Sequence, residues 1–231
     1  MSLGSDFDAG PLGQDRSFQE ALRRLPMFPL PNVVLFPHAL LPLHIFEERY
    51  REMARDILAG QRFLALALIA PGQDLDVVEK PSVRPVAGIG EVVMAHELAD
   101  GRFNLVVRGR ARIHIDDELI SDRPYRLITA STLADLPPAD PGELRDADQS
   151  LRALVSQLAD AIPEGGELLR QVVASQETSS ELVDVLAAAL VVDATQRQSL
   201  LETRDVLRRI ERVSAEVVTM TARISSSSVV N

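Results

Sequence analysis

Residues 25–50, LPMFPLPNVVLFPHALLPLHIFEERY, decide the fold, because short apolar runs alternate there with prolines. A proline fixes φ, removes a backbone donor and biases the preceding residue toward extended geometry, so this stretch cannot form one continuous helix. The apolar runs instead predict three short, largely buried strands, at residues 27–30, 33–36 and 41–45. The prolines that separate them are Pro26, Pro29, Pro31, Pro37 and Pro42.

Further along the chain, one helix pattern is followed by strand patterns as far as residue 132. The continuous apolar run FLALALIA predicts a strand that is buried on both faces. Asp100-Gly101 lies between two strand patterns and is a strong signal for a two-residue hairpin turn. The expected elements are a helix at 47–59 and strands at 63–70, 90–98, 103–115 and 125–132.

The second strand of this hairpin is predicted to have a cationic outer face. Apolar or small residues occupy the odd positions of 103–115, and the even positions are mostly polar. Side chains alternate between the two faces of a strand, so the strand is expected to be half-buried. With a two-residue turn, Glu91 falls opposite Arg110 and Glu97 opposite Asn104. The cationic residues of the outer face are Arg108, Arg110 and Arg112.

The pattern becomes helical after an acidic, proline-rich segment at residues 134–148, where we place a domain boundary. Helices are expected at 144–162, 167–175 and 182–192, and a last helix capped by Asp193 is expected to run to 224. Strands with one helix, followed by a run of helices, indicate an α+β fold. The predicted organisation is a disordered or partly helical tail at 1–24, a β domain at 25–133, the linker at 134–148, a helical subdomain at 149–224 and a tail at 225–231.

Three segments resemble the Lon protease N-terminal domain, the substrate-binding module of ATP-dependent Lon. They are LPMFPLPNVVLFPHALLPLHIFEERYREM from residue 25, GIGEVVMAHELADGRFNLVVRGRARIHI at 88–115, and LAAALVVDATQRQSLLETRDVLRRIERV at 186–213. They occur in the order that the family has. The resemblance implies a PUA-like β pseudo-barrel with one packed helix, followed by a C-terminal α-helical bundle.

Composition excludes several classes of protein. The 231 residues carry a net charge of −10, which argues against non-specific binding of nucleic acid. No cysteine is present, so neither disulfides nor thiolate metal sites can form, and the four histidines lie on separate segments, so no metal site is expected. The apolar runs are too short to span a bilayer, and no signal-peptide pattern is visible. We therefore expect a soluble, cytoplasmic protein with no cofactor and no membrane partner.

Neither catalytic centre of full-length Lon is visible in the sequence. A Walker A loop needs glycines followed by Gly-Lys-Ser/Thr, and a Ser-Lys dyad needs a lysine whose surroundings lower its pKa. Lys80 is the only lysine, and it lies in Glu-Lys-Pro-Ser within an acidic, proline-rich loop. We therefore expect a protein that is not an enzyme.

The leading hypothesis is a protein-binding module, as the resemblance implies. Apolar surface beside the proline corners would bind exposed or unfolded polypeptide segments, with core packing as the competing explanation for each residue. The partners would be polypeptide clients, or a separate protease or ATPase for which the chain acts as an adaptor. The candidate residues are Phe36, Pro37, Leu40 and Leu41.

The alternative hypothesis is an RNA-binding PUA-like module. The guanidinium groups of Arg108, Arg110 and Arg112 could hold phosphates or acidic peptide side chains, or they could form a solvated, salt-bridged face. The net charge and an aromatic content of 4% argue against RNA, because few rings are left for base stacking.

Overall fold

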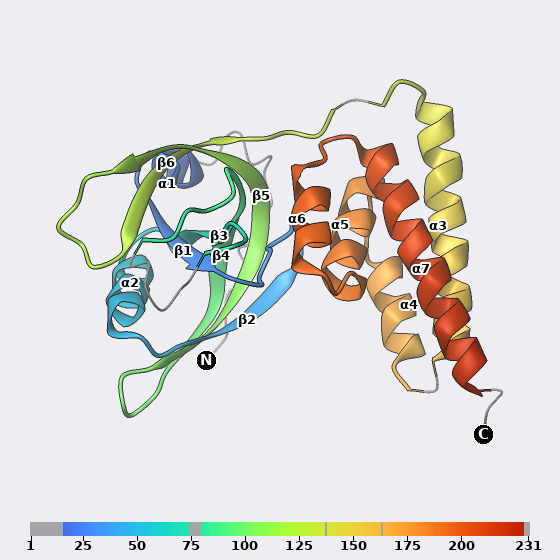
Figure 1. The fold of residues 1–231 in the computed structure, drawn as a ribbon, viewed down its shortest axis with the longest axis horizontal. Helices are drawn as coiled ribbons and strands as arrows, with labels where there is room; N and C mark the ends of the chain where they lie inside the picture. The colour runs from blue at the N-terminus through green and yellow to red at the C-terminus, as the bar shows by residue number, and fades with distance from the viewer. Residues whose placement is uncertain (1–15, 74–79, 137, 163, 229–231) are drawn as a thin grey trace, which may run out of the picture.

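The computed structural model describes residues 16–73, 80–136, 138–162 and 164–228. The strands and the first two helices form one unit, the barrel unit, and the remaining helices form the helical unit beside it (Figure 1). The elements of the barrel unit are α1 (Arg16–Ala21), β1 (Leu25–Leu30), β2 (Leu40–Ile45), α2 (Glu48–Ala59), β3 (Phe63–Leu68), β4 (Val86–Glu97), β5 (Phe103–Leu119) and β6 (Arg126–Thr132). Those of the helical unit are α3 (Pro141–Ala161), α4 (Gly166–Ala174), α5 (Ser179–Leu190), α6 (Ala194–Glu202) and α7 (Val206–Ser228). The α+β class is confirmed.

The strands form one sheet that closes on itself through β5. The strand order is β2-β5-β4-β3-β1-β6, and β5 also pairs with β6. Closure is possible because β5 is long: its first part pairs with β2 and its last part with β6. β3 is buried along its whole length, as the apolar run predicted, because Leu64 faces a core that includes α2 and Ala65 faces a core that includes α1.

The N-terminal segment after residue 15 is part of the core rather than a tail. Phe18 of α1 is fully buried and packs edge-on against Phe63, with ring centroids 5.5 Å apart. Ala21 and Leu22 are also buried in this cluster. Part of residues 16–24 is helical as predicted, in α1, but this segment packs into the core and is not a tail. Residues 1–15 lie outside the described part of the chain.

Residues 33–36 do not form the predicted strand. This segment crosses the sheet where glycines leave space: a Cβ built on Gly88 would lie 2.1 Å from the Leu35 carbonyl oxygen, and one built on Gly109 would lie 1.9 Å from the Phe36 carbonyl oxygen. Next to the crossing, His38 donates its backbone N–H to the Gly109 carbonyl at 2.9 Å. The apolar run is buried because its backbone lies directly on strands β4 and β5.

The hairpin between β4 and β5 has a different register from the one predicted. The Leu98 N–H donates to the Arg102 carbonyl, which leaves a three-residue turn with Gly101 at φ +78°. The turn and a register shift beside Val92 place Glu91 opposite Arg108 and Glu97 opposite Phe103. The predicted pairs Glu91 with Arg110 and Glu97 with Asn104 are therefore wrong, although Glu91 still reaches Arg110 diagonally at 3.6 Å.

The helical unit begins earlier than expected, and its last predicted helix is divided. Asp140 caps α3 by accepting from the Gly142 N–H, and Pro141 occupies its first turn, so 141–148 is helix rather than linker. Residues 203–205 separate α6 from α7, and α7 extends to Ser228, into the predicted tail. The segment leading to α3 lies along this break, where the Leu136 N–H donates to the Arg204 carbonyl at 3.1 Å.

Candidate functional site

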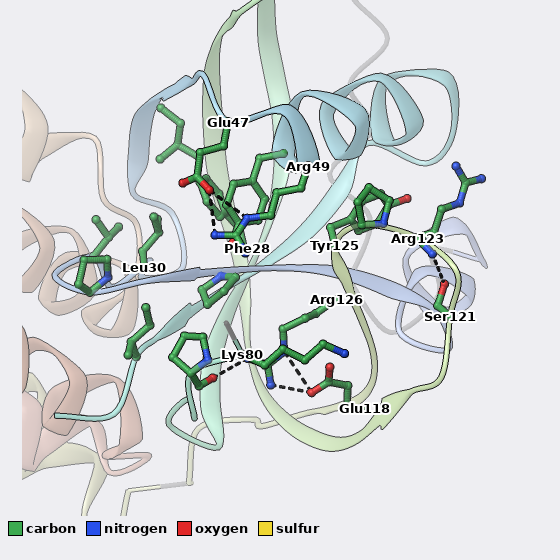
Figure 2. Close-up of a pocket in the computed structure, with 18 of the residues that line it drawn as sticks. Phe28, Leu30, Glu47, Arg49, Lys80, Glu118, Ser121, Arg123, Tyr125 and Arg126 are labelled. Carbon is green, nitrogen blue, oxygen red and sulfur yellow. Dashed lines mark hydrogen bonds and ion pairs between the residues drawn. The ribbon is translucent and has the colours of Figure 1, made fainter. Parts of the chain in front are cut away.

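A groove on the barrel unit is a large concave feature of the described residues. Its volume is about 980 Å³, and it is lined by the second half of β1, the corner between β2 and α2, residues 80–81 and the connection from β5 to β6. Figure 2 shows the Glu47–Arg49 pair at one end of the close-up and the Glu118–Arg126 pair at the other. Segments that are distant in the sequence thus meet around one opening.

The groove exists because β1 and β6 separate after a short ladder. β1 pairs with β6 only as far as Met27, but its pairing with β3 continues to Leu30. The Leu30 carbonyl accepts from the Ile69 N–H on the β3 side. Successive residues of a strand direct their backbone groups to opposite sides, so the backbone of Pro29 faces the β6 side. Proline has no N–H, so the strands separate there without leaving a donor unpaired.

One wall of the groove is aromatic, and its rings are largely buried, because Phe28 and Tyr50 are each only 6% exposed. The rings of Phe28 and Tyr50 lie with centroids 4.3 Å apart, and the Arg49 guanidinium lies 4.7 Å from the Tyr50 ring centroid. Burial raises the pKa of Tyr50 above its usual value. Burial, followed by the hydrogen bond to Asp56, also raises the pKa of Tyr125. Both phenols are neutral near pH 7, and this wall can pack against apolar side chains.

Two large apolar side chains lie exposed at the rim. Phe46, at the corner between β2 and α2, is 63% exposed, and Ile120, at the end of β5, is fully exposed. Both line the groove. Neither Phe46 nor Ile120 is among the site residues predicted from the sequence. The available signals were a phenylalanine directly before the acidic start of a helix, and the apolar pair Leu119-Ile120 between Glu118 and Asp122.

The predicted apolar site residues do not form one surface. Phe36 is fully buried and Pro37 is also buried, because the segment that carries them packs onto the sheet and against the helical unit. Leu41 is half-buried against the core that includes α2. Only Leu40, at 58%, is well exposed, and it does not line the groove. The assignment of Phe36 and Pro37 to a binding surface is therefore wrong.

The predicted arginine face is likewise not a continuous surface. Arg108 is exposed, and Arg110 is partly buried beside Glu91. Arg112 is only 3% exposed, because β5 passes under the helical unit at this point. It donates to Asp184 of α5 at 2.8 and 2.5 Å and to the Leu201 carbonyl at 3.0 Å. Arg112 is therefore unavailable to an external anion.

Arg112 belongs to a buried charge cluster, Arg112, Asp135, Asp184 and Arg209, that joins the two units. Arg209 of α7 is fully buried; it donates to Asp135 at 2.7 Å and lies 3.3 Å from Asp184. The Ser180 hydroxyl also donates to Asp135. Two guanidinium groups and two carboxylates compensate each other, and the cluster fixes the barrel unit against the helical unit.

The charge cluster makes the contribution of Asp135 to stability dependent on pH. Burial alone would raise the pKa of Asp135, but the hydrogen bonds and charge of Arg209 outweigh burial and hold this pKa below the usual 3.8. The folded state then binds fewer protons than the unfolded state, so the stabilisation is complete above the usual pKa and is lost as the pH falls below it. We expect the difference in unfolding free energy between wild type and Asp135→Asn to shrink between about pH 5 and pH 3. Urea titrations at each pH measure it, and a constant difference would contradict the assignment.

The described residues offer no cluster for metal binding, and one Ser, His and Asp group among them has the wrong order for a catalytic triad. They contain no group of three or more His, Asp or Glu side chains that could hold a metal ion. His114 and Ser131 both hydrogen-bond to Oδ1 of Asp116 at 3.0 Å. The carboxylate thus lies between the other two groups, whereas a Ser-His-Asp triad requires the imidazole there. Among the helices of the described part, none is long and apolar enough to cross a membrane.

Comparisons with known proteins agree on one family. The family described as ATP-dependent protease La (LON) substrate-binding domain matches residues 24–219. The chain is 28% identical over 190 residues to Lon protease of Rhizobium meliloti and 25% identical over 196 residues to Lon protease of Koribacter versatilis. These alignments cover 81% and 83% of the chain but only 23% of each relative. The chain therefore spans about a quarter of the length of these relatives.

Solved structures show the same fold. The N-terminal domain of Mycobacterium avium complex Lon protease superposes with a TM-score of 0.65 at 17% identity, covering 85% of this chain and 98% of that one. The Lon N-terminal domain protein from Xanthomonas campestris gives 0.52 at 24% identity, covering 83% and 97%. At these identities the likeness establishes the fold alone.

Proposed function

Because the chain belongs to the family of the ATP-dependent protease La (LON) substrate-binding domain, we propose that it binds exposed apolar segments of other polypeptides in the groove and catalyses no reaction itself. The observation that carries the proposal is the position of Phe46 and Ile120. Each exposes a large apolar side chain to water at the rim of the same opening. An extended segment lying in the groove would remove both from water.

The geometry supports binding through side chains. Phe28 and Tyr50 lie largely buried at the base of the groove, so most of the apolar area open to a ligand comes from Phe46 and Ile120 at the rim. Fully burying one such side chain contributes about 1.5–3 kcal/mol. The groove volume of about 980 Å³ is at the upper end of the range for ligand pockets, which fits several side chains of a segment rather than one small molecule.

We expect the double variant Phe46→Ser with Ile120→Ser to bind an uncharged apolar peptide at least about tenfold more weakly than wild type. The reason is the loss of the apolar area that the ligand would cover. Fluorescence anisotropy of a labelled peptide, with leucine and phenylalanine spaced by serine and glutamine, measures the dissociation constant. Because both residues are exposed, the unfolding free energy should change by no more than about 0.5 kcal/mol.

Val192→Ser is the matched control. Val192 is 85% exposed but lies on the helical unit, outside the groove. This variant should bind the peptide as wild type does. Equal affinities for wild type and the double variant would overturn the groove as the binding site.

A further inference from the structure

We infer that the groove prefers polypeptide segments whose apolar side chains are flanked by aspartate or glutamate, and that Lys80 binds the flanking carboxylate. This inference rests on the proposed function, because it specifies the charge of the segment that the same groove would bind. Lys80 lines the groove, is exposed and is the only lysine of the chain.

The three arginines that line the groove are already paired. Arg49 lies 2.8 Å from Glu47, Arg126 lies 2.6 Å from Glu118, and Arg123 lies 2.8 Å from Asp56. Arg126 also donates to the Pro81 carbonyl at 2.7 Å, next to Lys80. Within residues 16–73, 80–136, 138–162 and 164–228, Lys80 has no such ion pair. Among the charged side chains of the described lining, the Lys80 ammonium group is therefore the one that remains available to a ligand.

The carboxylates of the described lining are also paired. Glu47 and Glu118, the two acidic residues among the described lining, each bind an arginine. Among the described lining residues, a basic segment would find both carboxylates already paired and would approach an ammonium group. An acidic segment would find that ammonium group, which is a compact charge on a flexible stem and adjusts to a carboxylate in more than one position.

The preference has to be local, because the chain as a whole carries a net charge of −10. Charges separated by more than about 8 Å are largely screened at physiological ionic strength, so the distant acidic residues contribute little there. A pair formed at the groove is screened less. The sign of the preference is thus set by Lys80 rather than by the net charge.

Three short labelled peptides test the inference against the full chain. They share one apolar core and differ only in the flanking residues, which are Asp, Asn or Lys. We expect the Asp-flanked peptide to bind about three- to fivefold more tightly than the Asn-flanked one, as for an exposed ion pair. Lys80→Gln should reduce this ratio to one without changing the affinity for the Asn-flanked peptide, and Lys80→Arg should keep it.

Arg108→Gln is the charge-matched control. Arg108 is exposed, lies outside the groove, and its substitution removes the same unit of charge. This variant should keep the wild-type ratio. If the Asn-flanked peptide binds but the Asp-flanked one binds no more tightly, or if the ratio survives Lys80→Gln, this inference is overturned and the proposed function stands. If the Asn-flanked peptide does not bind at all, the proposed function fails, and this inference fails with it.

Discussion

Replacing Asp184 by asparagine is expected to lower the free energy of unfolding by about 3–5 kcal/mol. Asp184 is fully buried and lies between two buried guanidinium groups, those of Arg112 and Arg209. The asparagine has nearly the same shape but no charge, so the cluster would keep two cations and one anion away from water. Urea unfolding followed by circular dichroism measures the change.

A surface ion pair provides the control for this variant. Asp160 pairs with Arg170 where both side chains are exposed, so Asp160→Asn should cost less than about 1 kcal/mol. A loss below about 1 kcal/mol for Asp184→Asn as well would mean that water or a rearranged Asp135 compensates the two arginines, and it would contradict the structural role of the charge cluster.

Replacing Gly109 by alanine is expected to cost about 3 kcal/mol or more, because the new methyl group has no space. Its Cβ would lie 1.9 Å from the Phe36 carbonyl oxygen and 2.8 Å from the carbonyl carbon. Both are backbone atoms of the segment that crosses the sheet, so a side-chain rotation cannot relieve the clash. The crossing segment would lift, and Phe36 would lose its burial. The thermal midpoint and the unfolding free energy both report this change.

Gly60→Ala separates this steric effect from the general effect of removing a glycine. Gly60 lies at φ −113° and ψ −133°, outside the left-handed region, and its Cβ would lie 3.3 Å from the nearest atom, the Asp56 carbonyl oxygen, which is a close contact but not the overlap found at Gly109. We expect a change of no more than about 1 kcal/mol there. Similar losses at Gly60 and Gly109 would show that the close approach of the crossing segment is not what requires glycine at 109.

Much of the fold could be predicted from local patterns. The run FLALALIA is buried on both faces as β3, and Thr178 with Glu181 forms the capping box that opens α5. Both patterns act over a few residues, so their outcome depends little on the rest of the chain. The break after α6 had a weaker signal: residues 203–205 contain neither proline nor glycine, although Asp205 directly before α7 accepts from the Arg208 N–H as an N-cap does. The helix ends where the segment around Leu136 pairs with the chain.

The candidate site could not be predicted in the same way. Alternation on β5 assigned Arg108 and Arg112 to one face of a strand, and it carries no information about the helical unit that covers Arg112 and leaves Arg108 exposed. The same limit applies to Phe36 and Phe46. Both follow apolar residues near prolines, but Phe36 is buried under the helical unit and Phe46 extends from the corner before α2. Burial of this kind depends on contacts between distant segments.

Pro29 affects whether a polypeptide in the proposed groove could extend the sheet at the edge of β1. An open strand edge normally invites another extended chain to continue the sheet, which is how soluble proteins begin to co-aggregate with unfolded ones. Here the residue of β1 whose backbone faces the opening is Pro29, which has a carbonyl but no N–H. A polypeptide in the proposed groove would find the Pro29 carbonyl as an acceptor but no donor there, so a strand added to β1 at this position would have a weaker ladder. Under the proposed function, binding through side chains rather than through a continued sheet would stay reversible.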